Sequence, residues 1–188
     1  MKEVAVLFAR KDSIYKTMPE CDVFDIERNA LTFRGDEPII AHPPCRSWGR
    51  LKALSKGDHK EKQLAIWAVR QVRKNGGVLE HPETSSLWKV LGLPLGSQRD
   101  KWGGYTLSVD QHWWGHRARK RTWLYIVGVE PSEIPAYTMN FRPVEFWVGN
   151  SQRKFQRPSI SKSEREATPP DFAKWLVSLA KSASINNK

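Results

Sequence analysis

The segment Ile39-Ile40-Ala41-His42-Pro43-Pro44-Cys45 constrains the fold more than any other part of the chain. Its apolar residues predict a short buried strand, and the two prolines that follow fix φ and stiffen the turn. The Cys45 thiol is therefore expected at a defined point beyond a strand end. In an open α/β sheet, ligands bind at the carboxyl ends of strands, so this thiol is a candidate nucleophile. The alternative, that Cys45 is only a small buried apolar residue, stays open.

Other apolar runs predict further strands of the same sheet. Residues 4–9 form a continuous apolar run, as expected for a buried parallel strand, and residues 22–26 alternate. A short strand is expected at 78–80, where Pro82 ends it. Residues 122–127 give the strongest strand signal, because they are dense in β-branched and aromatic side chains.

Two helices are predicted between and after these strands. The first covers 58–75 and is closed by Gly76-Gly77; its apolar face consists of Leu64, Trp67, Ala68 and Val72. The second starts with Thr168 as N-cap, Pro169 at the first helical position and Asp171 completing a capping-box pattern. Its apolar face consists of Phe172, Trp175, Leu176 and Leu179. Residues 91–104 and 130–165 are expected to be loops.

Strands separated by helices predict an α/β fold, with a mostly parallel sheet and helices on its faces. At 188 residues the chain is expected to form one domain over 1–180, followed by a polar tail at 181–188. No stretch approaches the ~20 apolar residues of a membrane span. The two cysteines, Cys21 and Cys45, make no disulfide framework. We therefore expect a soluble protein of the cytoplasm.

The chain carries 31 Lys and Arg residues against 20 Asp and Glu residues, for a formal net charge of +11. This balance favours a polyanionic partner, and DNA is preferred to a membrane because no basic amphipathic anchor is evident. The chain also has nine tryptophans, and exposed aromatic side chains among basic residues form stacking platforms for unpaired bases. Charge therefore predicts the class of partner but not the chemistry.

Residues with functional side chains lie in a fixed order at predicted strand ends and helix starts. The order is Phe8-Ala9-Arg10, Asp25, Pro43-Pro44-Cys45, Glu80-His81-Pro82 and the basic run from Gly115 to Arg121. This ordered set resembles the cytosine-C5 DNA methyltransferase family and looks closest to small, divergent methylase-like proteins of bacteriophages and prophages. Pro43–Cys45 resembles the family's Pro-Pro-Cys loop, and Leu79–Pro82 resembles its Glu-Asn-Val strand end. Arg117–Arg121 resembles the family's Gln-x-Arg-x-Arg strand entry, and Ala167–Ala173 resembles its Asn-x-Val-Pro-Pro helix start.

The resemblance implies a Rossmann-like, methyltransferase-type sheet and a role for each catalytic residue. Cys45 would add as a thiolate to C6 of cytosine, which makes C5 enamine-like, and nearby Arg or His charge would lower the pKa of the thiol. Glu80 would hydrogen-bond the base edge and stabilise charge at N3. Arg119 and Arg121 would grip the target phosphate or carbonyl. The base would have to be flipped out or unpaired to reach such a pocket.

The resemblance also implies S-adenosylmethionine as cofactor. Phe8 would stack on its adenine and Asp25 would bind its ribose hydroxyls, with Ala9, Pro43 and Thr168 completing the cofactor site. DNA would be contacted by the basic and aromatic side chains near the catalytic positions, namely Arg46, Trp48, Arg50, His116, Arg117 and Lys120.

Several features depart from the family pattern. The glycine-rich loop after the first strand is absent, and Arg10-Lys11-Asp12 stands in its place, so the backbone cannot approach a cofactor as closely. Cys45 is followed by Arg46-Ser47-Trp48-Gly49 in place of the family's Gln-x-Phe-Ser. Only about 40 residues separate the strand near Val127 from the last helix, too few for a separate target-recognition domain. Sequence discrimination should therefore be modest.

Each functional assignment has a structural alternative. Glu80 could cap a strand or pair with an arginine, Asp25 could be a turn residue, and the basic run could be a solvated face. His112 and His116, with Cys45 and His81, could suggest zinc, but no tight ligand pattern supports it and no metal is expected. The whole protein could instead be a catalytically inactive, methyltransferase-derived phage protein that binds DNA or a host defence or regulatory protein. A third alternative keeps the thiol chemistry but acts on a free pyrimidine nucleotide.

Overall fold

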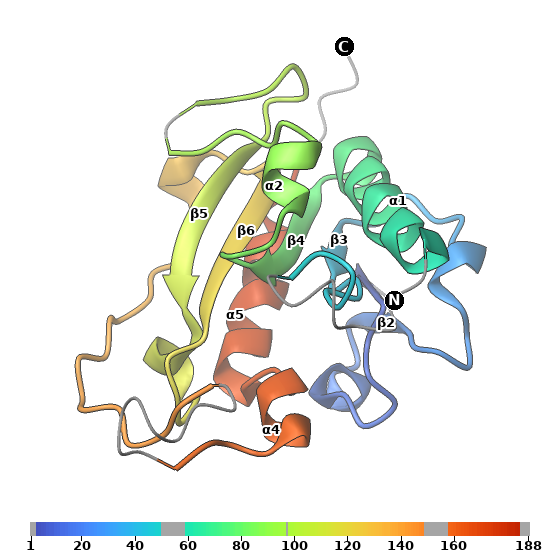
Figure 1. Ribbon diagram of the computed structural model, residues 1–188. Helices are drawn as coiled ribbons and strands as arrows, with labels where there is room; N and C mark the ends of the chain where they lie inside the picture. Colours follow the sequence, from blue (N-terminus) through green and yellow to red (C-terminus); the bar gives the residue numbers. More distant parts are fainter. Residues whose placement is uncertain (1–2, 50–58, 97, 149–157, 185–188) are drawn as a thin grey trace.

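A six-stranded sheet forms the centre of the computed structural model, which describes residues 3–49, 59–96, 98–148 and 158–184 (Figure 1). The strand order is β2-β1-β3-β4-β6-β5. The strands are β1 (Val4–Leu7), β2 (Cys21–Phe24), β3 (Ile39–Ala41), β4 (Gly77–Pro82), β5 (Tyr105–Asp110) and β6 (Arg121–Val127).

One strand of this sheet runs against all the others. β1 is parallel to β2 and β3, and β3 is parallel to β4, whereas β6 is antiparallel to both β4 and β5. β5 therefore runs in the same direction as β1 to β4. The chain passes from β1 to β2 on one side and from β3 to β4 on the other, so the strand order switches between β1 and β3. The carboxyl ends at such a switch are where open α/β sheets bind ligands.

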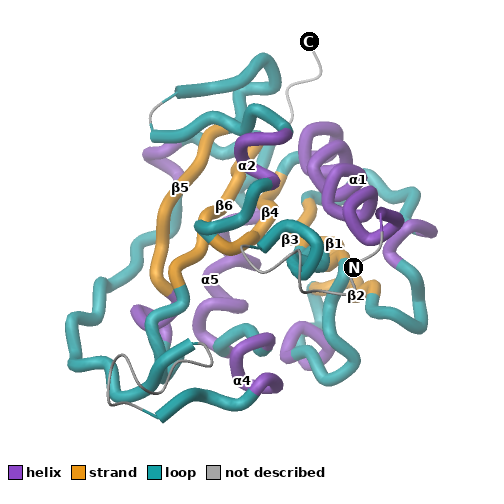
Figure 2. The backbone as a smooth tube through the Cα atoms, viewed as in Figure 1, coloured by secondary structure: helices purple, strands orange, loops and turns teal. Residues whose placement is uncertain are grey.

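Helices lie on both faces of the sheet (Figures 1 and 2). The α-helices are α1 (His59–Asn75), α2 (Leu87–Val90), α4 (Lys162–Glu166) and α5 (Pro170–Lys181). Short 3₁₀ turns connect other elements: η1 (Ile14–Thr17), η2 (Ala30–Thr32), η3 (Gln111–Trp114) and η4 (Pro131–Glu133). No helix in the described ranges is long and apolar enough to cross a membrane.

Alternate residues of the buried strands point to two separate cores, as the pleat of a strand requires. On one face, strand residues pack with α5; this core includes Val4, Val6, Ile40, Val78, Leu124, Phe172, Leu176 and Leu179. On the other face, strand residues pack with α1 and α2; this core includes Ala5, Leu7, Ile39, Leu79, Ala65, Ala68, Val72 and Trp88. The predicted α/β class with helices on both faces is confirmed.

Most predicted elements lie within one or two residues of the observed ones. The predicted strand at 39–41 is β3, and those at 78–80 and 122–127 lie within β4 and β6. The predicted strands at 4–9 and 22–26 each extend two residues past the ends of β1 and β2. The helix predicted at 58–75 is α1, and Gly76 (φ 77) follows it as expected. Gly77 (φ 106) is the first residue of β4, and a Cβ added to it would lie 2.1 Å from the Ile39 carbonyl oxygen. β3 and β4 can therefore approach this closely only because residue 77 is glycine.

The structure corrects the prediction in four places. The short helix α2 was not predicted. β5 was not predicted, although Tyr105–Asp110 alternates between apolar and polar residues as a half-buried strand does. α4 begins inside the segment expected to be a loop, 130–165. There Ser161 accepts a hydrogen bond from the Glu164 amide and caps a helix of only five residues. The N-cap of α5 is Pro169, one residue after the predicted Thr168, and no side chain caps this helix. The predicted capping box is therefore wrong.

Candidate functional site

The carboxyl edge of the sheet brings together residues at the ends of β1, β3 and β4. Leu7 is in register with Ala41, and Ala41 is in register with Leu79. The next residues along the chain therefore lie at the same edge of the sheet; they are Phe8, His42 and Glu80. β5 ends and the reversed β6 begins at this edge too, so the segment from Gln111 to Arg121 joins it.

The carboxylate of Glu80 is held from two sides. His42 Nδ1 lies 3.1 Å from Glu80 Oε2, and Gln111 Nε2 donates to Glu80 Oε1 at 3.1 Å. Tyr15 from η1 lies behind His42, with its hydroxyl 3.1 Å from His42 Nε2. Thr122 fixes Gln111 from the other side, because its Oγ1 accepts from Gln111 Nε2 at 3.0 Å. The side chains of His42 and Glu80 are each 14% exposed, so the pair borders solvent.

Glu80 is ionised in this setting. Burial opposes its ionisation, but the hydrogen bond from His42 and the positive charge of Lys120 outweigh burial and lower the pKa of Glu80 to about 2. Beside it, His81 is fully buried and burial lowers its pKa to about 4, so that ring is neutral. Glu80 therefore presents a fixed negative charge at the sheet edge.

Cys45 is exposed, as a nucleophile must be, but its thiol is not activated. Partial desolvation of the sulfur and the nearby Glu80 carboxylate raise the pKa of Cys45, and Lys120 only partly offsets them. The expectation that neighbouring Arg or His charge lowers this pKa is wrong, because the dominant neighbour is an anion. The Cys45 carbonyl accepts from the Trp48 and Gly49 amides, both at 3.0 Å, and this turn fixes the position of the residue.

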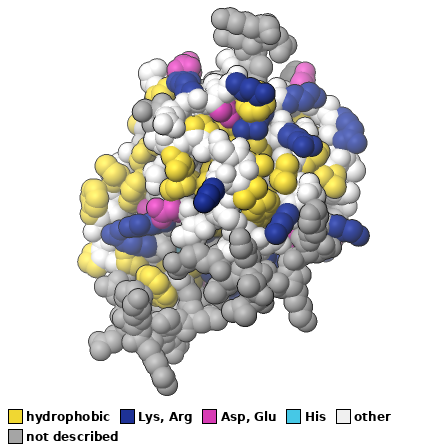
Figure 3. Space-filling model, turned by 45° about the horizontal axis from the view of Figure 1, so that its top comes forward, with side chains coloured by type: hydrophobic (Ala, Val, Ile, Leu, Met, Phe, Trp, Pro, Cys, Tyr) yellow, Lys and Arg dark blue, Asp and Glu magenta, His cyan; other side chains and the backbone are white. Residues whose placement is uncertain are grey.

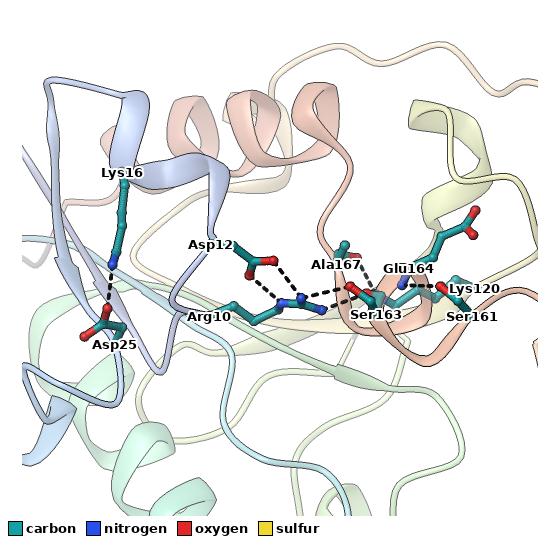
Figure 4. A network of polar contacts seen from close by, with 9 residues as sticks. All are labelled: Arg10, Asp12, Lys16, Asp25, Lys120, Ser161, Ser163, Glu164 and Ala167. Atoms are coloured by element: carbon teal, nitrogen blue, oxygen red, sulfur yellow. Dashed lines mark hydrogen bonds and ion pairs between the residues drawn. The ribbon is translucent and has the colours of Figure 1, made fainter.

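Two cations of the site anchor the end of α4 (Figure 4). Arg10 Nη1 donates to the Ser163 carbonyl at 2.7 Å, and Lys120 Nζ donates to the Ala167 carbonyl at 3.0 Å. The Ser163 carbonyl also accepts from the Ala167 amide at 3.0 Å, so the two cations add to the hydrogen bonds of this short helix. Arg10 is further paired with Asp12, with Nε 2.8 Å from Oδ1. α4 is thus fastened to the edge beside Glu80.

Asp25, expected to bind ribose hydroxyls, has its carboxylate occupied within the chain (Figure 4). It is 5% exposed, and Lys16 Nζ lies 2.6 Å from its Oδ2. Its Oδ1 accepts from the Glu27 and Arg28 amides at 2.9 and 3.0 Å, which closes the turn after β2. The hydrogen bond from Lys16 and these amides lower the pKa of Asp25 to about 2. The structure thus has the turn arrangement that was the alternative for this residue.

The other predicted cofactor residues are placed around the first strand end and α5. Phe8 has φ 62, in the left-handed region that a bulky side chain rarely adopts, and its ring meets Trp67 edge-on at 5.9 Å. The Ala9 amide donates to the Phe24 carbonyl at 3.0 Å. Pro43 is buried and Thr168 is half-buried. Strain at Phe8 marks the point at which the family resemblance expects a glycine-rich loop to begin.

The predicted arginines are exposed, and most have carboxylate partners. Arg117 Nε lies 2.5 Å from Glu164 Oε1, and its guanidinium stacks over Phe146 at 4.0 Å. Arg121 pairs with Glu83 at 3.6 Å. Arg46 pairs with Glu61 at 2.5 Å, and Arg119 is exposed. Figure 3 shows another view of the surface, in which Lys and Arg side chains are scattered among neutral and apolar ones.

Two predicted nucleic-acid contacts are turned inward. Trp48 is 4% exposed and His116 is 5% exposed, so neither ring offers a face to a base in this structure. The Trp48 carbonyl accepts from the Ser86 amide at 2.9 Å, which ties its loop to the start of α2. Arg50 lies outside the described residues.

The histidines that could have suggested zinc bind backbone oxygens. His112 Nδ1 lies 2.7 Å from the His116 carbonyl, and His116 Nδ1 lies 2.7 Å from the Ala118 carbonyl. Within the described part of the chain, no three His, Cys, Asp or Glu side chains are arranged to hold a metal ion.

Sequence reasoning missed the residues that surround Glu80 and Asp25. His42 directly precedes the Pro-Pro turn and so shared its signal, but Tyr15 and Lys16 lie in a 3₁₀ turn without periodicity. Gln111 follows β5, which was itself not predicted. Comparison with known proteins gives no match to a family model, a curated protein or a solved structure. Function is therefore inferred from the geometry at this sheet edge.

Proposed function

We propose that the protein is a cytosine-C5 DNA methyltransferase-like enzyme in which Cys45 is the nucleophile and Glu80 binds the edge of a flipped or unpaired base. One observation carries this proposal: the adjacent parallel strands β3 and β4 deliver Cys45 and Glu80 to one sheet edge. The Glu80 charge acts directly on the Cys45 thiol, and Lys120 acts on both groups. A thiol, a carboxylate and a cation are the groups that addition to a pyrimidine requires.

The sheet supports a Rossmann-like, methyltransferase-type fold. Four of its strands, β2, β1, β3 and β4, are parallel neighbours with helices on both faces of the sheet, as the proposed fold requires, whereas β6 is antiparallel to its neighbours. The strand-order switch between β1 and β3 places the ligand site next to the Pro-Pro turn.

The proposed reaction begins when Cys45 loses its proton to solvent. Its sulfur then forms a bond to C6 of cytosine, and the electrons of the C5–C6 double bond move to C5, with Glu80 hydrogen-bonded at the base edge. Because Glu80 raises the pKa of the thiol, the thiolate depends on Lys120, the cation that favours it. Arg119 and Arg121, at the entry to β6, are the proposed contacts to the target phosphate.

S-adenosylmethionine is the methyl donor that the resemblance implies, and we propose it as the cofactor to be tested first. In the observed arrangement the expected residues do not fit it. The Asp25 carboxylate is paired with Lys16 and closed by two amides, and Arg10 reaches across to α4. Ribose binding would require Lys16 to leave Asp25. The thiol addition itself needs only the chain and the base.

Hydrogen exchange at cytosine C5 tests the proposed chemistry without a cofactor. Reversible addition of Cys45 makes C5 of cytosine enamine-like, so in D₂O this carbon takes up a deuteron and then loses its original proton. The Cys45 thiolate leaves C6 as the C5–C6 double bond forms again. We expect deuterium at C5 of a cytosine-containing single-stranded oligonucleotide, and none with Cys45→Ala. Cys21→Ala is the control, because this buried cysteine lies at the start of β2. Exchange that survives Cys45→Ala contradicts the proposal. Exchange on deoxycytidine monophosphate alone would favour the free-nucleotide alternative.

A second candidate function is a catalytically inactive, methyltransferase-derived protein that binds DNA or a host protein. The internal pairing of Asp25 with Lys16 favours it, because the expected ribose ligand is already used. Calorimetry with S-adenosylmethionine, with and without DNA, distinguishes the two functions. Micromolar binding, about −8 kcal/mol, contradicts the inactive form.

A further inference from the structure

A line of hydrogen bonds runs from the core to Glu80. Tyr15 is fully buried, and its hydroxyl lies 3.1 Å from His42 Nε2. The other nitrogen of the same ring, Nδ1, lies 3.1 Å from Glu80 Oε2. In this line, His42 contacts both the buried Tyr15 hydroxyl and the Glu80 carboxylate at the sheet edge.

The partners of His42 determine which nitrogen carries the proton. A carboxylate only accepts hydrogen bonds, so Nδ1 must be protonated to bind Glu80. In the neutral ring Nε2 then has a free lone pair, which accepts the Tyr15 hydroxyl proton. Burial, with a smaller effect of Glu80, raises the pKa of Tyr15 well above its ordinary value, so the phenol stays protonated and can donate. Every group in the line then has one consistent role.

This line fixes the direction in which Glu80 faces. His42 occupies Oε2 and Gln111 occupies Oε1, so both oxygens are held from inside the protein and keep their remaining lone pairs for a ligand. The His42 ring is itself packed against the Tyr15 ring, with centroids 5.5 Å apart. A carboxylate held in this way cannot rotate away from the base.

We propose that His42 is a positioning residue for Glu80 and that Tyr15 holds the His42 ring in the orientation that binds Glu80. The proposal rests on the function proposed for Cys45 and Glu80, and adds two residues to that site. The ionisable groups that act on Glu80 come from several elements around it: His42 after β3, His81 on β4, Lys120 before β6, Cys45 in the Pro-Pro turn and Tyr15 in η1.

Nitrogen NMR of the wild-type protein tests the tautomer without any catalytic assay. We expect the neutral His42 ring to be protonated at Nδ1 with Nε2 unprotonated. Tyr15→Phe removes the donor to Nε2 but leaves the bond to Glu80, so the ring should keep its Nδ1 proton while the Nε2 resonance moves. A wild-type ring protonated at Nε2, or an Nε2 resonance that is unchanged in Tyr15→Phe, overturns the role of Tyr15.

A matched pair of substitutions tests the positioning role. The amide nitrogen of Asn reaches the place of Nδ1, whereas that of Gln reaches the place of Nε2. His42→Asn should therefore keep the bond to Glu80 and retain cytosine C5 exchange within a few-fold. His42→Gln should lose the bond, raise the pKa of Glu80 and slow exchange on the order of 100-fold, as misplacement of a catalytic group does.

The Glu80 titration is followed by carboxyl-carbon NMR in both variants, so it reports on positioning even where exchange is absent. Equal titration of Glu80 in the wild type and His42→Gln overturns the positioning role. If the wild-type protein shows the Nδ1 tautomer and a low Glu80 pKa but no exchange, the proposed function fails while the inference about His42 stands.

Discussion

Replacing Glu80 by Gln should destabilise the protein at neutral pH and flatten the acid side of its stability profile. The substitution keeps the shape of the side chain and removes its charge. In the folded protein the hydrogen bond from His42, together with positive charge, holds the pKa of Glu80 at about 2, below its ordinary value of 4.5. A group whose pKa is lowered by folding stabilises the folded state above its unfolded pKa, and this contribution is lost as the pH falls toward the folded pKa.

The size of the effect follows from that difference in pKa. One pKa unit corresponds to about 1.4 kcal/mol, so ionised Glu80 contributes about 3 kcal/mol at pH 7. The contribution begins to fall near pH 5, and about 2 kcal/mol of it is gone by pH 3. Because the side chain is only 14% exposed, solvent screening does not remove most of this energy.

Urea unfolding of the wild type and Glu80→Gln at pH 7 and pH 3 measures this difference. We expect the variant to be less stable by about 3 kcal/mol at pH 7, with the gap shrinking by about 2 kcal/mol at pH 3. Glu83→Gln is the control, since Glu83 pairs with exposed Arg121 at 3.6 Å and should change the free energy of unfolding by under about 0.5 kcal/mol. A gap that stays constant between the two pH values refutes the reasoning, because the charge of Glu80 would then not contribute.

Three further predictions concern the fold, the cofactor and DNA. Gly77→Ala should cost at least about 1–3 kcal/mol in urea unfolding, because its φ is +106 and a Cβ would meet backbone at 2.1 Å; a loss under about 0.5 kcal/mol would contradict the close strand approach. Lys16→Gln should strengthen S-adenosylmethionine binding in calorimetry by freeing Asp25, and unchanged binding would remove Asp25 from the cofactor site. Arg119→Ala should reduce the slope of the logarithm of DNA affinity against the logarithm of salt concentration by about one. Trp48→Phe should leave this slope unchanged, because Trp48 is buried; equal effects would contradict the placement of both residues.

The buried strands could be predicted because burial on both faces leaves an uninterrupted apolar run. Ile39–Ala41 is such a strand, and it alone implies the position of Cys45. β5 lies at the edge of the sheet, where Ser108 is exposed, so it alternates between apolar and polar residues and has no continuous apolar run. α4 depends on one capping serine and on Arg10 and Lys120, and no periodicity can develop in five residues.

The candidate site could be predicted only in part. Parallel strands imply that residues following them meet at one edge, and Cys45 and Glu80 do. The state of each group depends on partners that approach from elsewhere in the fold. Lys16 reaches Asp25, and Tyr15 reaches His42, both from a 3₁₀ turn with no sequence signature. The raised pKa of Cys45 likewise follows from desolvation of the thiol and from the proximity of Glu80, neither of which sequence spacing reveals.

The central claim is that the Cys45 sulfur adds to C6 of a pyrimidine base held at this sheet edge. The most direct measurement is intact-protein and peptide mass spectrometry after incubation with a single-stranded oligonucleotide that carries 2-pyrimidinone in place of one cytosine. This base lacks the exocyclic amino group and accepts thiols at C6 more readily. A covalent adduct on the peptide that contains Cys45, lost in Cys45→Ala, is the predicted result. An unmodified protein, or an adduct on Cys21, would contradict the account.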